Sequence, residues 1–472
     1  MMNTMIDENE VVFKSVEKEI FSYVCHLGCQ AIKEMLESLD RELMENRDKS
    51  IYRNKGSRKT TIKTLCGEVT FNRTVYEVAQ EDGLKRCVYL LDETIGLKGI
   101  GLFSPGYVEQ LLSGITEMSY RVCAEQLSNA TGQVISAMGV WGIVQRLGEY
   151  LEEEEEHLVQ QHKRNELRGE LKSQVIFEEN DGVYIELQGK DRTKTKKSAE
   201  MKLSLAYDGW KVTGSNRYVL QNKVATAGFE RAKDFARRHE AKMAAKYDLD
   251  NTRLRVLNAD GANWTKNKIE VDCFQLDPFH RNKAIQTYIN RPDAAKAIRE
   301  LLYQGKVEEL LSYLEKYRDS LSDDKEIKDA DTLLMYYRNN KEGLLSYKKQ
   351  VQVPEPEEGI VYRNLGTMEG HVWSIIARRM KNNHTCWSIA GGGHMGKLLA
   401  LKESGMLDKA LRFLNRPVFE KNQLERIKEE IPIPHSKLTE GSGYQYPVTG
   451  HIKRLDNSSG ITRKSILHFV GC

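Results

Sequence analysis

The sequence predicts an α/β protein in which the catalytic core is interrupted by an all-helical insertion and preceded by an α+β region with a helix-turn-helix. Strand-like and helix-like segments alternate between residues 173 and 285, a pattern typical of a sheet covered by helices. Residues 293–353 contain no proline and repeat their apolar side chains with helical spacing. Residues 51–150 combine an alternating β pattern with two helical patterns. We therefore expect the sheet core in two pieces, one on each side of the helical block.

Length and composition set broad limits on function. The 472 residues, 40% of them hydrophobic, suffice for about three domains of ~100–200 residues. The net charge of +3 is small, so any basic surface must be local. Eight cysteines without paired spacing are typical of the reducing bacterial cytoplasm. The sequence contains neither a signal peptide nor a run of about 18 apolar residues, so we expect no membrane partner.

The N-terminal pattern predicts a long helix followed by a β-hairpin. Apolar residues recur with helical spacing across residues 8–48. Residues 61–65 and 69–76 alternate around Cys66-Gly67-Glu68, which is typical of a hairpin. The segment just before the hairpin has no acid and four basic residues: Arg53, Lys55, Arg58 and Lys59. This segment is either a solvated loop or a contact to nucleic-acid phosphates.

Residues 119–148 predict two helices around a turn at Thr131-Gly132. This pattern is typical of a helix-turn-helix, whose second helix can enter the DNA major groove. Arg121 and Gln133 are then candidate DNA contacts. An ordinary helical hairpin remains the alternative. The acidic run Glu152 to Glu156 follows and is expected to be solvated on a long helix.

The β-β-β-α-β order within residues 173–259, followed by another strand and then helices, is typical of the ribonuclease H-like plan. That plan places acids at the ends of neighbouring strands. The candidates are Asp181, Asp260 and Glu369, the last on a helix that begins near Met368. Three carboxylates repel one another unless divalent cations lie between them. Two such ions can bind the attacking and leaving oxygens of a phosphoryl transfer.

Each candidate acid also has a purely structural interpretation. Asp181 and Asp260 both precede glycine, and Asp-Gly is a strong turn signal. Glu369 opens a helix, where the helix dipole favours an acid without any catalysis. For the position of the first acid, Glu178 and Glu179 compete with Asp181. Asp208 competes for a place in the trio as well, although "AYDGW" is more typical of a hairpin turn.

Two further motifs carry candidate binding residues. Asp277 and His280 form a D-x-x-H motif at a strand end, where a histidine can bind a phosphate oxygen or orient an acid. A lone histidine is more often structural. Arg378 and Arg379 follow Trp373 on the late helix and are either DNA-phosphate contacts or part of a solvated face.

Taken together, these segments resemble the insertion-sequence transposases of the Lre-two type. That group has long been catalogued as an uncharacterised protein family of Gram-positive bacteria and is related to the Mutator-like DDE transposases. The resemblance covers nearly the whole chain. It rests on "RNKGSRKTTIKTLCGEVTFNRTVYE", "SYRVCAEQLSNATGQVIS", "EENDGVYIELQ", "VLNADGANW", "LDPFHRNKAI" and "GTMEGHVWSIIARRMK".

The resemblance implies a ribonuclease H-like catalytic core with a helical insertion before the last acid. It implies that Asp181, Asp260 and Glu369 are catalytic and bind two Mg²⁺ or Mn²⁺ ions. Asp277 and His280 match the supporting [C/D]-x-x-H signature of the Mutator-like group. The implied partner is double-stranded DNA, at the terminal inverted repeats of an element and at its target. A homo-oligomer on DNA, acting at the nucleoid, is expected.

The changes of pattern predict seven segments. These are an N-terminal helical region (1–50), a DNA-binding region with the hairpin and helix-turn-helix (51–150), a linker helix (151–172), the first part of the core (173–285), the helical insertion (286–356), the second part of the core with the Glu369 helix (357–430) and a basic tail (431–472). Two other functions fit the same residues. One is a DNA-binding regulator whose acids are turn residues, and the other is a metal-dependent nuclease that cuts without joining.

Overall fold

The computed structural model describes residues 12–79, 84–97, 101–266, 271–412 and 414. The chain divides into two compact units, residues 1–416 and 417–472. All of the described residues belong to the first unit. The predicted basic tail (431–472) and the end of the predicted second core segment lie outside the described residues.

The N-terminal part consists of a long helix packed on a small antiparallel sheet. The side chain of Asp40 accepts hydrogen bonds from the backbone N–H (3.0 Å) and hydroxyl (2.7 Å) of Thr74, which fixes the helix to the sheet. The predicted helix and hairpin are confirmed. The basic segment 53–59 is part of the first strand and not the loop considered as one alternative. The elements are α1 (Phe13–Asn46), β1 (Arg53–Lys63), β2 (Glu68–Ala79), β3 (Lys85–Val88) and α2 (Leu90–Thr94).

Three helices follow, α4 (Pro105–Ile115), α5 (Tyr120–Thr131) and α6 (Ala137–Lys163). A serine caps the start of each, because its hydroxyl accepts from a backbone N–H in the first turn. Gly132 ends α5 at φ 67°, as the predicted turn requires. The two predicted helices are therefore present, and α6 runs unbroken across residue 150.

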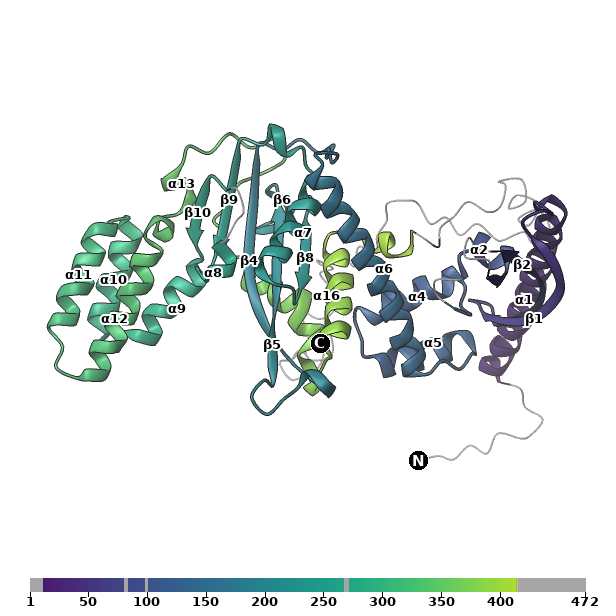
Figure 1. Cartoon of the computed structure of the whole chain (residues 1–472). Coiled ribbons are helices and arrows are strands. Elements are labelled where there is room, and N and C mark those ends of the chain that lie inside the picture. Colours follow the sequence, from purple (N-terminus) through teal and green to yellow (C-terminus); the bar gives the residue numbers. More distant parts are fainter. Residues whose placement is uncertain (1–11, 80–83, 98–100, 267–270, 413, 415–472) are drawn as a thin grey trace, which may run out of the picture. The chain divides into compact units, whose positions relative to one another are not determined.

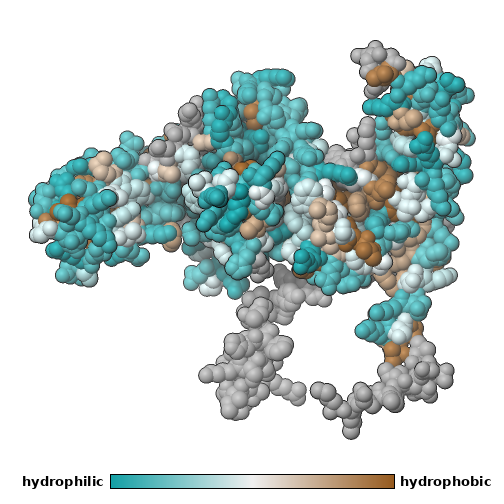
Figure 2. Space-filling view, turned by 60° about the horizontal axis from the view of Figure 1, so that its bottom comes forward, coloured by the Kyte–Doolittle hydropathy of each residue, from teal (hydrophilic) through white to brown (hydrophobic). Residues whose placement is uncertain are grey.

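The region of α4, α5 and α6 carries exposed apolar side chains, and Figure 2 shows hydrophobic side chains gathered there. Val140, Ile143 and Val144 of α6 are buried. Val134, just before α6, is 81% exposed, and Met138 is 70% exposed. The apolar pattern of residues 134–144 therefore covers both a buried and an exposed face.

The central sheet has the strand order β10-β9-β4-β5-β8 (Figure 1). β4 is antiparallel to β5 and β5 to β8, whereas β4, β9 and β10 are mutually parallel. The predicted mixed α/β class is confirmed. A separate hairpin, β6 (Trp210–Gly214) and β7 (Arg217–Leu220), lies between β5 and β8 in the chain. The strands of the sheet are β4 (Val175–Glu186), β5 (Ser198–Tyr207), β8 (Val224–Gly228), β9 (Leu254–Ala259) and β10 (Cys273–Leu276).

Successive side chains of β4 point to opposite faces of the sheet, and different helices cover the two faces. Ile176 packs in a cluster with Met243 and with Tyr247 just after α7 (Ala232–Ala244). Phe177 belongs to the large core that includes Met368, Val372 and Ile376 of the late helix. That helix begins as α14 (Met368–His371), widens into a π-helical segment (Val372–Ala377) and ends as α15 (Arg378–Met380). The helix predicted near Met368 is thus confirmed, and it packs under β4.

The predicted helical insertion has its own hydrophobic core, which includes Ile298, Leu314 and Leu333. Tyr336 donates its hydroxyl to the carbonyl of Asp260 just after β9 (2.7 Å), which connects the insertion to the sheet. Tyr337 donates to the carbonyl of Arg281 in the first helix of the block (3.1 Å), a contact between helices. The insertion therefore supports the loop that follows β9. Its helices are α9 (Pro278–Tyr288), α10 (Pro292–Gln304), α11 (Val307–Asp319) and α12 (Asp324–Asn339).

A buried ionic cluster joins α6, α7 and α16 (Ile389–Glu403). Glu155 of α6 lies 2.5 Å from the ammonium of Lys242 and 2.6 Å from that of Lys397, which is 2% exposed. The expectation that residues 152–156 are all solvated is therefore wrong at Glu155. Helical periodicity places this one member of the run toward α7 and α16. Within the described residues, no helix combines the length and apolarity needed to cross a bilayer.

Candidate metal centre

Asp181, His280 and Glu369 lie together at one edge of the sheet. One potential ligand atom from each residue lies within 4.8 Å of those of the other two. Asp181 comes from the interior of β4, His280 from the first turn of α9 and Glu369 from the first turn of α14. The structure thus gathers two of the three predicted acids and the predicted supporting histidine, which are separated by about 190 positions in the chain.

Local sequence explains how His280 and Glu369 reach this edge. Asp277 caps α9 by accepting from the backbone N–H of His280 (3.1 Å), and Pro278 starts the helix with its fixed φ. The same carboxylate lies 3.0 Å from Nδ1 of His280, so the imidazole is held through one nitrogen. Before α14, Gly366 adopts φ +119°, which glycine tolerates and L-residues rarely do.

The electrostatics of the cluster suit a cation. Burial, with smaller contributions from the charges of Asp260 and Glu369, raises the pKa of Asp181 to about 6 against the lowering effect of His280. The hydrogen bond that the imidazole of His280 makes to Asp277 raises the pKa of His280, as do the charges of Asp181 and Asp260. Carboxylates suit Mg²⁺ and Mn²⁺, and an imidazole suits transition-metal ions. The residues present therefore fit a divalent cation.

Asp260 lies beside this group but is not a member of it among the described residues. The parallel register pairs Asn180 with Ala259, which places Asp260 next to Asp181 on the neighbouring strand. Its Oδ1 accepts from the backbone N–H of Ala262 (2.9 Å) and the hydroxyl of Thr265 (3.0 Å). The group of three therefore contains His280, with Asp260 beside it. The trio of Asp181, Asp260 and Glu369 stays a prediction.

The geometry also selects Asp181 over its competitors. Glu178 faces His239 of α7 (4.0 Å) and accepts from Arg255 of β9 (2.8 and 2.9 Å), and burial raises its pKa to about 7. Glu179 is fully buried beneath the cluster and accepts hydrogen bonds there. Asp208 lies outside the group and accepts from Asn222 (2.6 Å).

Comparison with known proteins places this chain in a family. The model of the uncharacterised protein family UPF0236 matches residues 6–417. The chain belongs to UPF0236. It is 25% identical over 403 residues to the "UPF0236 protein in vanSb 3'region" of Streptococcus gallolyticus, and the alignment covers 83% of each chain. All three residues of the cluster lie within the matched range of this UPF0236 protein.

Sequence reasoning missed a set of buried polar residues under the cluster. Glu179, Asn258 and Gln275 are cross-strand partners on β4, β9 and β10, and all are buried. A sequence signal for them exists. In each strand, a polar residue interrupts the apolar run two positions before an aspartate, as in "END", "NAD" and "QLD". Burial of polar groups in three adjacent strands requires hydrogen bonds between them.

Two of the predicted DNA contacts are corrected. Gln133 is buried and donates its amide to the carbonyl of Thr64 (2.6 Å). Arg379 is also buried: its Nε donates to the carbonyl of Ile115 (2.8 Å), and its guanidinium lies against the rings of Tyr120 and Trp387. Both side chains are used to join segments far apart in the chain, so neither is free to contact DNA.

The other predicted contacts are exposed. Arg53, Lys55, Arg58 and Lys59 project from β1, and Lys55 pairs with Glu77 (3.2 Å). Arg121 and Arg378 line one cleft of about 810 Å³ between the start of α5 and the end of the helix that carries Glu369. Two arginines that the sequence separates by more than 250 positions therefore share a surface.

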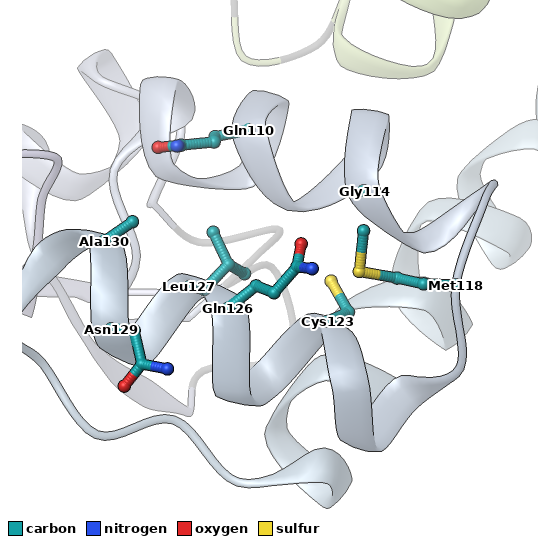
Figure 3. A pocket seen from close by; sticks show the side chains of 8 residues that line it. All are labelled: Gln110, Gly114, Met118, Cys123, Gln126, Leu127, Asn129 and Ala130. Carbon is teal, nitrogen blue, oxygen red and sulfur yellow. The ribbon is translucent and has the colours of Figure 1, made fainter. Parts of the chain in front are cut away.

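A second cavity, of about 480 Å³, lies between α4 and α5. Figure 3 shows the side chains that line it, among them Cys123, Met118 and Gln126. Burial raises the pKa of the Cys123 thiol to about 11, which disfavours the reactive thiolate. Its eight lining residues include no carboxylate, imidazole, ammonium or guanidinium group.

Proposed function

We propose that this UPF0236 protein is a DNA transposase of the DDE type, which cuts and joins DNA at the ends of an insertion sequence. The observation that carries the proposal is the convergence of Asp181, Glu369 and His280, with Asp260 beside them. The sheet supports it. β4, β5 and β8 are successive antiparallel strands, and α7 then leads to β9 beside β4. This is the order expected for a ribonuclease H-like core.

The proposed mechanism assigns a role to each side chain of the centre. Asp181 and Glu369 bind the cation through carboxylate oxygens, and Asp260 supplies further negative charge beside them. Bound Mg²⁺ or Mn²⁺ supplies Lewis-acid stabilisation of the charge that develops on a phosphodiester. Asp277 orients the imidazole of His280 through Nδ1, leaving Nε2 for the cation or a phosphate oxygen.

Two structural features support the proposal that the exposed arginine side chains bind DNA. Arg121 and Arg378 share a cleft that begins at the end of the Glu369 helix. Trp373 lies one helical turn after Glu369 and is 57% exposed. An indole at such a position can stack on a base, while the arginines contact phosphates.

We expect Arg121→Ala and Arg378→Ala to weaken DNA binding, each with a smaller salt dependence than the wild type. Removing one arginine that neutralises a phosphate should reduce the slope of log K against log salt by ~0.9, where K is the association constant for DNA. Fluorescence anisotropy with labelled duplex DNA between 50 and 200 mM KCl, which spans about a fourfold change in salt, measures both effects. Arg164→Ala, an exposed arginine paired with Glu166, is the matched control and should change neither. Equal slopes for all four proteins would argue against this surface.

The function itself is tested with DNA that flanks the gene encoding this protein. Incubation with Mg²⁺ or Mn²⁺ should yield cleavage at inverted repeats, a free 3′-hydroxyl and strands joined to target DNA. Asp260→Asn should bind the same DNA without cutting it. Cutting without joining would instead favour a nuclease. Sequence-specific binding that is unaffected by Asp260→Asn, without any cutting, would favour a regulator.

A further inference from the structure

A line of buried polar side chains crosses the parallel strands directly beneath the metal centre. Glu179 and Asn258 have no exposed surface, and Gln275 is 3% exposed. The three are neighbours in register across β4, β9 and β10. Polar groups inside a sheet destabilise the fold unless each is hydrogen-bonded, so a purely structural sheet would carry apolar residues here.

Glu179 accepts five hydrogen bonds. Its Oε1 accepts from the hydroxyls of Tyr207 and Thr367, both at 2.6 Å. Its Oε2 accepts from the amide of Asn258 (3.0 Å) and from the backbone N–H groups of Gly366 (3.3 Å) and Thr367 (3.2 Å). An ionised carboxylate is the only side-chain group of this size that accepts at both ends without donating.

Three of these five donors belong to the turn that immediately precedes α14. Thr367 is bound through both its hydroxyl and its backbone N–H, and Glu369 follows it by two positions. Glycine at position 366, with its positive φ, allows the turn to bring both backbone N–H groups to the same oxygen. The place of Glu369 is therefore set by Glu179 and not by the helix alone.

Asn258 extends the connection to the histidine. Its Nδ2 donates both to Glu179 and to Oδ1 of Asp277 (2.9 Å). Its Oδ1 accepts from Gln275 (3.2 Å), which fixes the orientation of the amide. The other oxygen of Asp277 lies 3.0 Å from Nδ1 of His280. One hydrogen-bonded path therefore runs from the turn before Glu369, through Glu179, Asn258 and Asp277, to His280.

We propose that Glu179 is the positioning residue of the metal centre, fixing Glu369 through Thr367 and His280 through Asn258 and Asp277. The inference rests on the cation-binding part of the proposed function and is independent of DNA joining. The residues that hydrogen-bond to metal ligands hold those ligands in place. Loss of such a residue typically lowers metal affinity 10–100-fold.

The test compares two neighbouring buried acids of β4. Glu179→Gln removes the negative charge. Its new N–H₂ faces either the N–H groups of Asn258, Gly366 and Thr367, which cannot accept from it, or the hydroxyls of Tyr207 and Thr367, which must then accept instead of donating. We expect the Mn²⁺ dissociation constant, measured by electron paramagnetic resonance on the full chain without DNA, to rise about 10–100-fold. Glu178→Gln is the matched control, because Glu178 is equally buried but faces Arg255 on the other side of the sheet. It should leave Mn²⁺ affinity within about twofold.

A second variant keeps the proposal testable if Glu179→Gln does not fold. Thr367→Val removes one hydroxyl donor to Glu179 and leaves the backbone N–H, and we expect a weaker but measurable loss of Mn²⁺ affinity. Wild-type affinity in a folded Glu179→Gln protein, or in Thr367→Val, would overturn the inference. Wild-type protein that binds Mn²⁺ at the centre without cutting DNA would overturn the proposed function alone.

Discussion

Replacing Asp181 with asparagine should abolish divalent-cation binding and, with it, DNA cleavage. Asp181 is the buried carboxylate of the cluster, and an amide supplies one neutral oxygen in its place. Loss of a direct ligand should exceed the ~10–100-fold effect typical of outer partners, so we expect more than a 100-fold fall in Mn²⁺ affinity. Isothermal titration with Mn²⁺ measures binding, and a gel assay on element-end DNA measures cleavage. Unchanged Mn²⁺ affinity would remove Asp181 from the site.

The same substitution should stabilise the metal-free protein at neutral pH. Burial and nearby acids raise the pKa of Asp181 from 3.8 to about 6, so folding favours the protonated carboxyl. The stability contributed by that proton is fully present below about pH 4 and is lost as pH rises through 6. The loss is up to about 3 kcal/mol, and asparagine avoids it.

Thermal melts without metal should therefore show Asp181→Asn above the wild type at pH 8, with the gap closing toward pH 4. Addition of Mn²⁺ at pH 8 should raise the melting temperature of the wild type and leave that of the variant unchanged. A variant that is less stable than the wild type at pH 8 without metal would contradict the electrostatic description of the cluster.

Glu155→Gln should be strongly destabilising while leaving the metal centre intact. Burial alone would raise the pKa of Glu155, but Lys242 and Lys397 outweigh it and hold the pKa at about 2. Removing this charge leaves the buried ammonium of Lys397 with Glu230 (3.2 Å) as its remaining acid. Breaking a buried ion pair from one side typically costs about 3–5 kcal/mol, and we expect a loss of that size in urea unfolding at pH 7.

The control for Glu155 lies on the same helix. Glu153 is exposed, and Glu153→Gln should change the free energy of unfolding by less than about 0.5 kcal/mol. Because the folded pKa of Glu155 is lowered, its contribution is present above about pH 4.5 and is lost as pH falls toward 2. A loss below about 1 kcal/mol for Glu155→Gln would mean that the cluster does not hold α6, α7 and α16 together.

The sequence predicts the strands of the core and several residues of the candidate site, because the acidic residues lie at recognisable positions in the strand and helix patterns. Asp181 and Asp277 lie in or just after apolar strand patterns, and Glu369 lies at the start of a helical pattern. The structure brings these elements together. The choice between Asp260 and His280 depends on how the turn after β9 binds Oδ1 of Asp260. That detail comes from a loop conformation, which periodicity does not encode.

Other errors share one physical origin. Gln133, Glu155 and Arg379 are polar side chains in segments whose pattern is typical of a surface, yet each is buried against a distant part of the chain. Polarity predicts exposure only where no tertiary partner is present. The sequence offers Glu179 only as an alternative to Asp181 for the first acid. Its role as a buried acceptor depends on five hydrogen-bond donors, which only the structure shows.

We propose that Asp181, Glu369 and His280 form a divalent-metal centre. Anomalous diffraction at the manganese edge, from crystals of the wild-type protein soaked in Mn²⁺, tests it most directly. We predict a peak bonded to the carboxylates of Asp181 and Glu369 that is lost in Asp181→Asn crystals treated identically. Saturating Mn²⁺ with no peak between these residues, or a peak that persists in the variant, would contradict the claim.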